Sequence, residues 1–156
     1  MKLLGRYDGR EYHSESIPLA RRLVSPFKEG PFACLLWTHG VARDVDQASD
    51  LLKSLLDSGC RYFVCGGEDC EWWHDMTDEL FVTKYLNATA AERERAHVMT
   101  TWHANESPED VAFFFVFNTS FDDISFERFL VIHIGNGNAA DLVDAKVQAQ
   151  AEALAG

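Results

Sequence analysis

Short apolar runs and helical patterns alternate along most of this chain. Four runs have the length and composition of buried strands, and they cover residues 32–37, 61–65, 97–102 and 126–134. Each run is followed by a segment with apolar residues at helical spacing, and these segments cover residues 44–59, 70–86, 107–118 and 138–154. Parallel strands need such crossovers between them, so the alternation predicts a mainly parallel sheet.

The third helical segment depends on its start signal, because its apolar residues alone could also form a strand. Ser107 can cap a helix with its hydroxyl group, and Pro108 suits the first helical position. Glu109 and Asp110 then place negative charge at the positive end of the helix dipole. These signals predict that the run 111–117 is helical.

The whole chain, residues 1–156, is expected to form one α/β domain with three layers, α/β/α. We expect a four-stranded, mainly parallel sheet in the flavodoxin-like or Rossmann-like order 2-1-3-4. Residues 1–31 show no sustained periodicity, so we expect an N-terminal arm, with a short helix at residues 19–23, that packs on the domain. Residues 89–96 carry a Thr-x-x-Glu capping box and predict one further short helix.

Polar residues follow the first and third predicted strands, which the expected order makes neighbours. Ligands of such folds bind outside the carboxyl ends of the strands, where the strand order reverses. His39, His103 and Glu106 are therefore candidates for acid–base or metal chemistry, although polar residues that merely end the strands would give the same pattern. The residues expected to face one another in this crevice are Thr38, His39, Gly40, Trp102, His103, Asn105 and Glu106.

A second candidate site follows the second predicted strand. Cys65, Cys70 and His74 are of the residue types that bind zinc, but structural zinc sites have four ligands and usually pair their cysteines more closely. Small buried cysteines and a surface histidine explain the pattern better, and we expect no metal. Glu68 is a candidate acceptor for ribose hydroxyl groups, but the Gly-x-Gly-x-x-Gly loop that accompanies such an acid is missing after the first strand.

A third candidate is the Gly-x-Gly-x-x-Ala loop after the fourth predicted strand, which begins with Gly135, Gly137 and Asn138. Such a loop lets backbone amides approach a phosphate group. The alternative is a plain turn in which Asn138 caps the last helix, because no later strand supplies an acidic ribose partner. We expect no bound cofactor. His133 lies among apolar residues and is expected to be a hydrogen-bonded core histidine.

Charge and composition narrow the possible partners. The chain has 14 Lys and Arg against 25 Asp and Glu, and its net charge of -11 disfavours nucleic acids and anionic membrane surfaces. The apolar content of 47% is enough for a core, so the four cysteines are expected to be reduced thiols of a cytoplasmic protein and not disulfide staples. No apolar run reaches the length of a signal peptide or a membrane span, which favours the same location.

One stretch carries a family resemblance. Thr-Thr-Trp-His at residues 100–103 is followed by Glu106, Ser107, Glu109, the paired phenylalanines and Asn118. This stretch resembles a family of small, uncharacterised bacterial single-domain α/β proteins, a domain of unknown function. The resemblance extends from the third strand through the fourth, and it implies a helix at residues 107–118 and a bacterial cytoplasmic setting. It implies no activity.

Two classes of function fit these observations. The first is a non-catalytic module that binds a small molecule, or that binds a basic protein in order to neutralise or regulate it, because the chain is acidic and lacks a catalytic motif. The second is a small enzyme, a hydrolase or one that acts on a nucleotide-like substrate, that uses His39 and His103. We favour the first class.

The third helical segment also predicts an interface. Its apolar side chains surround the helix, whereas a helix that covers a sheet needs only one buried stripe. A second copy of the chain would cover the outward side, and we expect a homodimer with Phe113, Phe114 and Phe117 at its interface. The alternative cover is the N-terminal arm, through Ile17, Leu19, Leu23 and Phe27.

Overall fold

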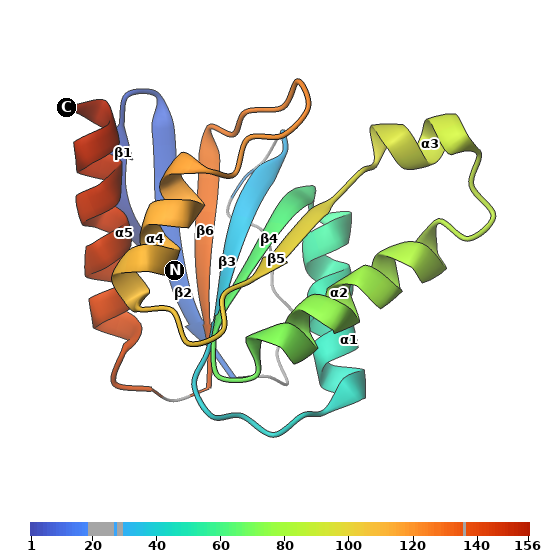
Figure 1. Cartoon of the computed structure of the whole chain (residues 1–156), viewed down its shortest axis with the longest axis horizontal. Coiled ribbons are helices and arrows are strands. Elements are labelled where there is room, and N and C mark those ends of the chain that lie inside the picture. The colour runs from blue at the N-terminus through green and yellow to red at the C-terminus, as the bar shows by residue number, and fades with distance from the viewer. Residues whose placement is uncertain (19–26, 28–29, 136) are drawn as a thin grey trace.

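A mixed sheet forms the centre of the molecule. The computed structural model describes residues 1–18, 27, 30–135 and 137–156 (Figure 1). In this part of the chain the sheet has six strands in the order β1-β2-β6-β3-β4-β5. β1 is antiparallel to β2, and all other neighbours are parallel. The strands are β1 (Lys2–Tyr7), β2 (Arg10–Ile17), β3 (Phe32–Thr38), β4 (Cys60–Gly67), β5 (Met99–Trp102) and β6 (Arg128–Ile134).

Helices cover both faces of the sheet, as Figure 1 shows, so the predicted α/β class is confirmed. α1 (Val45–Asp57) and α2 (Cys70–Lys84) pack on one face. α4 (Pro108–Phe117) and α5 (Ala140–Ala155) pack on the other, whereas the short α3 (Ala90–Arg95) projects away from the sheet. Within the described residues, no helix combines the length and the apolar character needed to cross a membrane.

Most helices begin where their capping residues predict. The Ser107 hydroxyl accepts a hydrogen bond from the backbone N–H of Asp110 at 3.1 Å, which confirms the predicted start of α4. Thr89 closes the predicted capping box at α3. The last helix differs, because its N-cap is Ala139 and not Asn138, and no side chain caps it.

The predicted strand order is wrong. The four predicted strands correspond to β3, β4, β5 and β6, and they lie in the order β6-β3-β4-β5. The order 2-1-3-4 would have placed β5 beside β3, but β6 occupies that position, and β5 pairs with β4 at the edge of the sheet. A short apolar run carries no information about which strand lies beside it, so the pattern could not decide the order. The strand order reverses between β3 and β6.

Residues 2–17 form a hairpin and not an irregular arm, so the sheet has six strands in place of the predicted four. Asp8 and Gly9 make its turn with φ angles of 49° and 80°, which match the twist of the paired strands. β2 then pairs with β6 from Glu11 to Ile17. The short helix predicted at residues 19–23 lies outside the described residues.

The core consists of two apolar clusters, one on each face of the sheet. β3 contributes to both, because successive side chains of a strand point to opposite faces. The cluster under α1 and α2 contains all four cysteines, which are buried free thiols, as the sequence predicted. Burial raises the pKa of the Cys34 and Cys65 thiols above the ordinary value, so both stay protonated.

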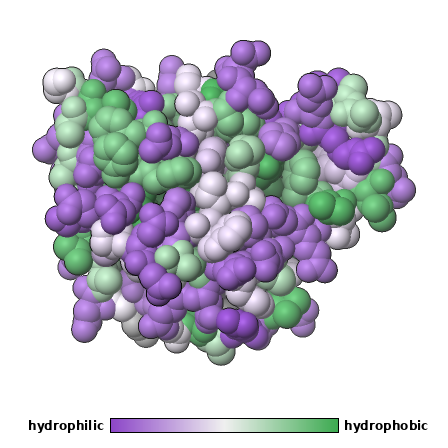
Figure 2. Space-filling model, viewed as in Figure 1, coloured by the Kyte–Doolittle hydropathy of each residue, from purple (hydrophilic) through white to green (hydrophobic). Residues whose placement is uncertain are grey.

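α4 buries one side and leaves two phenylalanines in contact with water. Phe113 and Phe117 are 47% and 36% exposed, and their rings stack with centroids 4.6 Å apart. Figure 2 shows hydrophobic side chains gathered over this helix. Ile17 and Phe27, which belong to the alternative cover by the N-terminal arm, pack in the cluster on the opposite face, and Leu19 and Leu23 lie outside the described residues.

Two phenylalanines of α4 provide a matched test of this packing. Phe115→Ala is expected to lower the free energy of unfolding by about 3–5 kcal/mol, because the ring is fully buried against Phe129. Phe113→Ala removes the same side chain from the exposed side, and its cost should stay within about 1 kcal/mol. Urea denaturation measures both losses. Equal losses would show that α4 does not pack as described.

Candidate functional site

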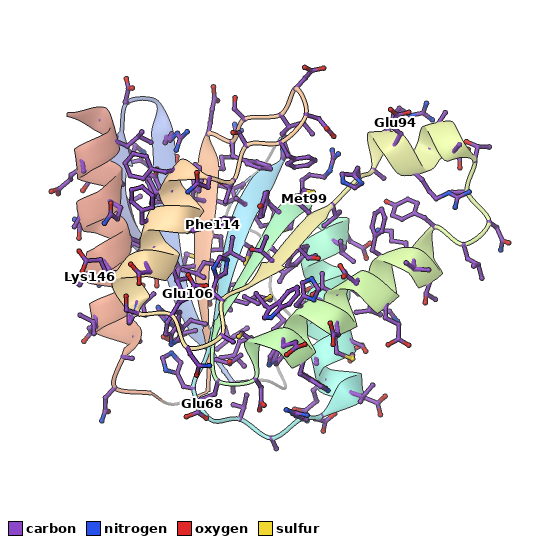
Figure 3. The ribbon with its side chains drawn as sticks, in the orientation of Figure 1. Glu68, Glu94, Met99, Glu106, Phe114 and Lys146 are labelled. Carbon is purple, nitrogen blue, oxygen red and sulfur yellow. The ribbon has the colours of Figure 1, made fainter. Side chains whose placement is uncertain are left out.

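An open cleft of about 620 Å³ lies at the carboxyl ends of the parallel strands. This edge of the sheet includes the point between β3 and β6 where the strand order reverses, which is where open α/β sheets bind ligands. Figure 3 labels both acidic residues that line the cleft, Glu68 after β4 and Glu106 after β5. The cleft is lined by Trp37, Thr38, His39, Gly40, Gly67, Glu68, His103, Asn105, Glu106, Gly137, Asn138 and Ala139.

Most of the candidate residues meet in this cleft although the predicted strand order is wrong. β4 lies between β3 and β5, but it ends in Gly66 and Gly67, which have no side chains to separate the flanking loops. A Cβ atom on Gly66 would lie 2.8 Å from the Trp37 ring, so the close approach requires glycine there. The candidates that line the cleft are Thr38, His39, Gly40, Glu68, His103, Asn105, Glu106, Gly137 and Asn138.

Trp102 does not line the cleft. It precedes His103 on β5, and adjacent side chains of a strand point to opposite faces of the sheet. The Trp102 ring lies 4.5 Å from the His74 ring of α2, whereas the His103 ring lies 4.5 Å from the Phe114 ring of α4. Trp102 therefore belongs to the exposed surface near α2.

The glycines after β6 bring that loop against His39. Gly135 has a φ of 91°, and a Cβ atom there would lie 2.9 Å from the carbonyl oxygen of His39. A Cβ atom on Gly137 would overlap the His39 ring, with Nδ1 as the nearest ring atom. Gly135 thus does not line the cleft, but it permits the contact that places Gly137 and Asn138 there.

His39 is hydrogen-bonded to the interior of the protein. Its Nε2 lies 3.2 Å from Nδ1 of His133, and Nε2 of His133 lies 2.8 Å from Oδ1 of Asp144. His133 is 1% exposed and Asp144 is 6% exposed. The prediction of a hydrogen-bonded core histidine at position 133 is confirmed, and this histidine connects the cleft to a buried carboxylate.

Asp144 is a residue of the site that the sequence analysis missed. The apolar residues Leu142 and Leu154 of the last helix are 49% and 36% exposed. Asp144 instead lies on the buried side together with Val143 and Val147. An acidic residue at a buried helical position needs a partner, and that requirement was the available signal.

His103 has a different environment from His39. Its Nδ1 lies 2.9 Å from Oε2 of Glu106, and its Nε2 lies 3.0 Å from Oγ1 of Thr101. The ring is buried against Phe114. Both ring nitrogens are thus engaged, and His103 orients Glu106, whose side chain is partly exposed in the cleft.

The cleft is rich in hydrogen-bond acceptors and carries negative charge. Glu68 and Glu106 contribute carboxylates, and none of the lining residues that the structure describes is Lys or Arg. Burial lowers the pKa of His39 below its ordinary value of 6.5, and the nearby His133 lowers it further, whereas the Glu68 carboxylate opposes the shift. His39 is therefore neutral at physiological pH.

The second candidate site from the sequence, made of Cys65, Cys70 and His74, does not form one site. Cys65 and Cys70 lie in the apolar cluster under α1 and α2, whereas the His74 ring nitrogens lie 3.0 Å from Asp75 and 3.4 Å from Asp78. Within the described ranges, no group of three or more His, Cys, Asp and Glu side chains is placed to hold a metal ion.

The low pKa of His39 predicts a pH-dependent contribution to stability. Between its folded-state pKa and the ordinary value of 6.5, the unfolded chain binds a proton that the folded protein does not bind. The contribution of neutral His39 to the free energy of unfolding is fully present above pH 6.5. It is lost as the pH falls from 6.5 through the folded-state pKa. Denaturation of wild type and His39→Gln over a pH series should therefore give a free-energy difference that is constant in the alkaline range and declines below about pH 6.5. A difference that does not change with pH would contradict the shift.

The comparisons with known proteins bear on the same region. Neither the curated proteins nor the solved structures contain a match to this chain. A family model described as domain of unknown function (DUF7684) matches residues 12–150, a range that includes every residue lining the cleft. The expected relationship to a domain of unknown function is thus confirmed, and the chain belongs to the DUF7684 family.

Proposed function

We propose that this chain is a ligand-binding α/β module whose cleft takes a small, polar molecule rich in hydrogen-bond donors, such as an amine, a guanidine or a polyol. The observation that carries the proposal is the composition of the cleft: two carboxylates and a neutral histidine, with no Lys or Arg among the described lining residues. Carboxylates accept hydrogen bonds and attract cations, and they repel phosphate groups.

The same chemistry suits a basic protein as an alternative partner. With a net charge of -11, the chain attracts a positively charged surface, and a Lys or Arg side chain could then enter the cleft between Glu68 and Glu106. Nucleic acids and anionic membrane surfaces remain disfavoured by this charge. A cytoplasmic location is part of the proposal, and the four buried free thiols support it.

A second candidate function is acid–base catalysis by a small enzyme. The hydrogen bonds that join His39 to His133 and Asp144 favour this reading, because catalytic histidines are commonly oriented by a buried acceptor. His103 would act in such an enzyme through Glu106 and not as a second base, since both of its ring nitrogens are engaged.

Charge-neutral substitutions test the binding site. Glu68→Gln and Glu106→Gln each remove one negative charge from the cleft and are expected to weaken binding of a cationic probe about tenfold or more. Ligand-observed NMR with agmatine, putrescine and a polyol such as inositol measures the effect, with inorganic phosphate as the anionic comparison.

Glu71→Gln is the matched control for this experiment. Glu71 is exposed in the first turn of α2 and carries the same charge, but it does not line the cleft. Its substitution should leave binding nearly unchanged. The proposal fails if phosphate binds better than the donor-rich probes, or if none of those probes binds wild type.

We also propose that the exposed aromatic pair of α4 mediates contact between two copies of the chain. The Phe113 and Phe117 rings stack on each other in contact with water, and such side chains are common at protein interfaces. Phe114 points inward, as Figure 3 shows, with its ring near those of Tyr62 and His103. We therefore assign the contact to Phe113 and Phe117.

Light scattering tests this self-association. Phe113→Glu and Phe117→Glu are expected to reduce the molar mass from that of a dimer to that of a monomer, because a buried unpaired carboxylate opposes association. Val82→Glu is the control, since Val82 is an exposed apolar residue of α2, a helix on the opposite face of the sheet. A wild-type protein that stays monomeric at high concentration would refute the dimer.

A further inference from the structure

The imidazole of His39 is the cleft end of a hydrogen-bond network in the interior of the protein. In this network, Nε2 of His39 lies 3.2 Å from Nδ1 of His133, and Nε2 of His133 lies 2.8 Å from Oδ1 of Asp144. At its far end, the Ser14 hydroxyl donates to the same Oδ1 of Asp144 at 2.8 Å, and the Lys2 ammonium lies 3.9 Å from Oδ2. Asp144 also borders a second cavity of about 290 Å³. The hydrogen-bond network thus connects two water-accessible regions, the cleft and this second cavity.

The direction of these hydrogen bonds follows from what each group can donate. A carboxylate only accepts, so His133 must donate its Nε2 proton to Asp144. Nδ1 of a neutral His133 then carries a lone pair and accepts a hydrogen bond from the N–H at Nε2 of His39. Nδ1 of His39 is left with a lone pair, and this is the ring atom nearest to where a Cβ atom on Gly137 would lie, and Gly137 lines the cleft.

We propose that His39 is the proton acceptor of the cleft, through Nδ1, and that His133 and Asp144 are positioning residues that fix its tautomer. His103 cannot take this role, because Glu106 and Thr101 occupy its two ring nitrogens. This role narrows the class of ligand: the bound molecule presents an N–H or O–H group to His39, while its other hydrogen-bond donors meet Glu68 and Glu106. This last step rests on the proposed function, whereas the tautomer does not.

The geometry also permits proton transfer without any further reactant. If the proton of the ligand moves to Nδ1, its bond to the ligand oxygen or nitrogen breaks, a bond to Nδ1 forms, and the ligand keeps the electron pair. His39 is then an imidazolium ion. Its Nε2 proton can pass to Nδ1 of His133, which returns His39 to a neutral ring and leaves the positive charge beside the Asp144 carboxylate.

Long-range proton–nitrogen NMR of the labelled, full-length protein tests the tautomer directly, because protonated and unprotonated imidazole nitrogens have well-separated shifts. The chain has six histidines, so the spectrum of His39→Gln identifies the His39 signals by their loss. In wild type above the pKa of His39, we expect a proton on Nε2 and none on Nδ1. A proton on Nδ1 would overturn the proposal.

Asp144→Asn distinguishes a positioning role from a purely structural one. With the carbonyl of the new amide facing the Lys2 ammonium on the Oδ2 side, its NH₂ group takes the place of Oδ1 and donates one proton to Nε2 of His133 and the other to the Ser14 hydroxyl oxygen. The hydrogen bonds between His133 and residue 144 and between His39 and His133 then both reverse their direction, and the proton of neutral His39 lies on Nδ1. Asp141→Asn removes the same charge from an exposed position of α5 and should leave the wild-type tautomer.

A second variant keeps the test decisive if Asp144→Asn does not fold. His133→Phe retains a buried ring but removes the acceptor for Nε2 of His39, so the nitrogen shifts of His39 should become averages over two exchanging tautomers. The proposal is wrong if either variant folds and keeps the wild-type tautomer of His39. Failure of the amine, guanidine and polyol probes to bind would overturn the ligand class alone, because the NMR result requires no ligand.

Discussion

β3 is the constraint on which the rest of the structure depends. It pairs with β4 on one side and β6 on the other, and all seven of its residues are buried. A strand in this position carries apolar side chains along its length, and polar groups begin only where it ends, at Thr38 and His39. Thr38 is already buried, and its hydroxyl donates to the backbone carbonyl of Glu68. The cleft therefore begins at the carboxyl end of this strand, where its last two residues and His39 line it.

The polar groups behind the cleft connect it to distant parts of the fold. A buried carboxylate without partners would be costly, but Asp144 accepts from His133 on β6 and from Ser14 on β2. The N-terminal hairpin, β6 and α5 are thus joined by one set of hydrogen bonds. Because every member has a partner, the set holds the ring of His39 in place instead of destabilising the core.

Local signals in the sequence predicted local structure well. The capping residues Ser107 and Thr89 identified α4 and α3, and the apolar runs identified four strands. The hairpin was missed although Asp8-Gly9 is a favoured two-residue hairpin turn, because its strands lack a clear apolar alternation: β2 buries the polar Ser14 where an alternating strand would show an apolar residue. Ser14 is buried because Asp144, 130 residues away in sequence, accepts a hydrogen bond from its hydroxyl group, and no local pattern contains that contact.

The composition of the cleft could be predicted even though the strand order could not. In a parallel sheet every carboxyl end lies at the same edge, so the loops after β3, β4, β5 and β6 gather there in any order. The roles of individual residues do depend on the order, because they are set by contacts between strands. His39 and His103 look equivalent in the sequence, because each directly follows a strand. β6 beside β3 gives His39 a buried histidine as partner, whereas His103, beyond β4, has only its own loop and strand to bond with. The difference between a ring that can accept a proton and a ring that holds a carboxylate in place therefore arises from the tertiary structure alone.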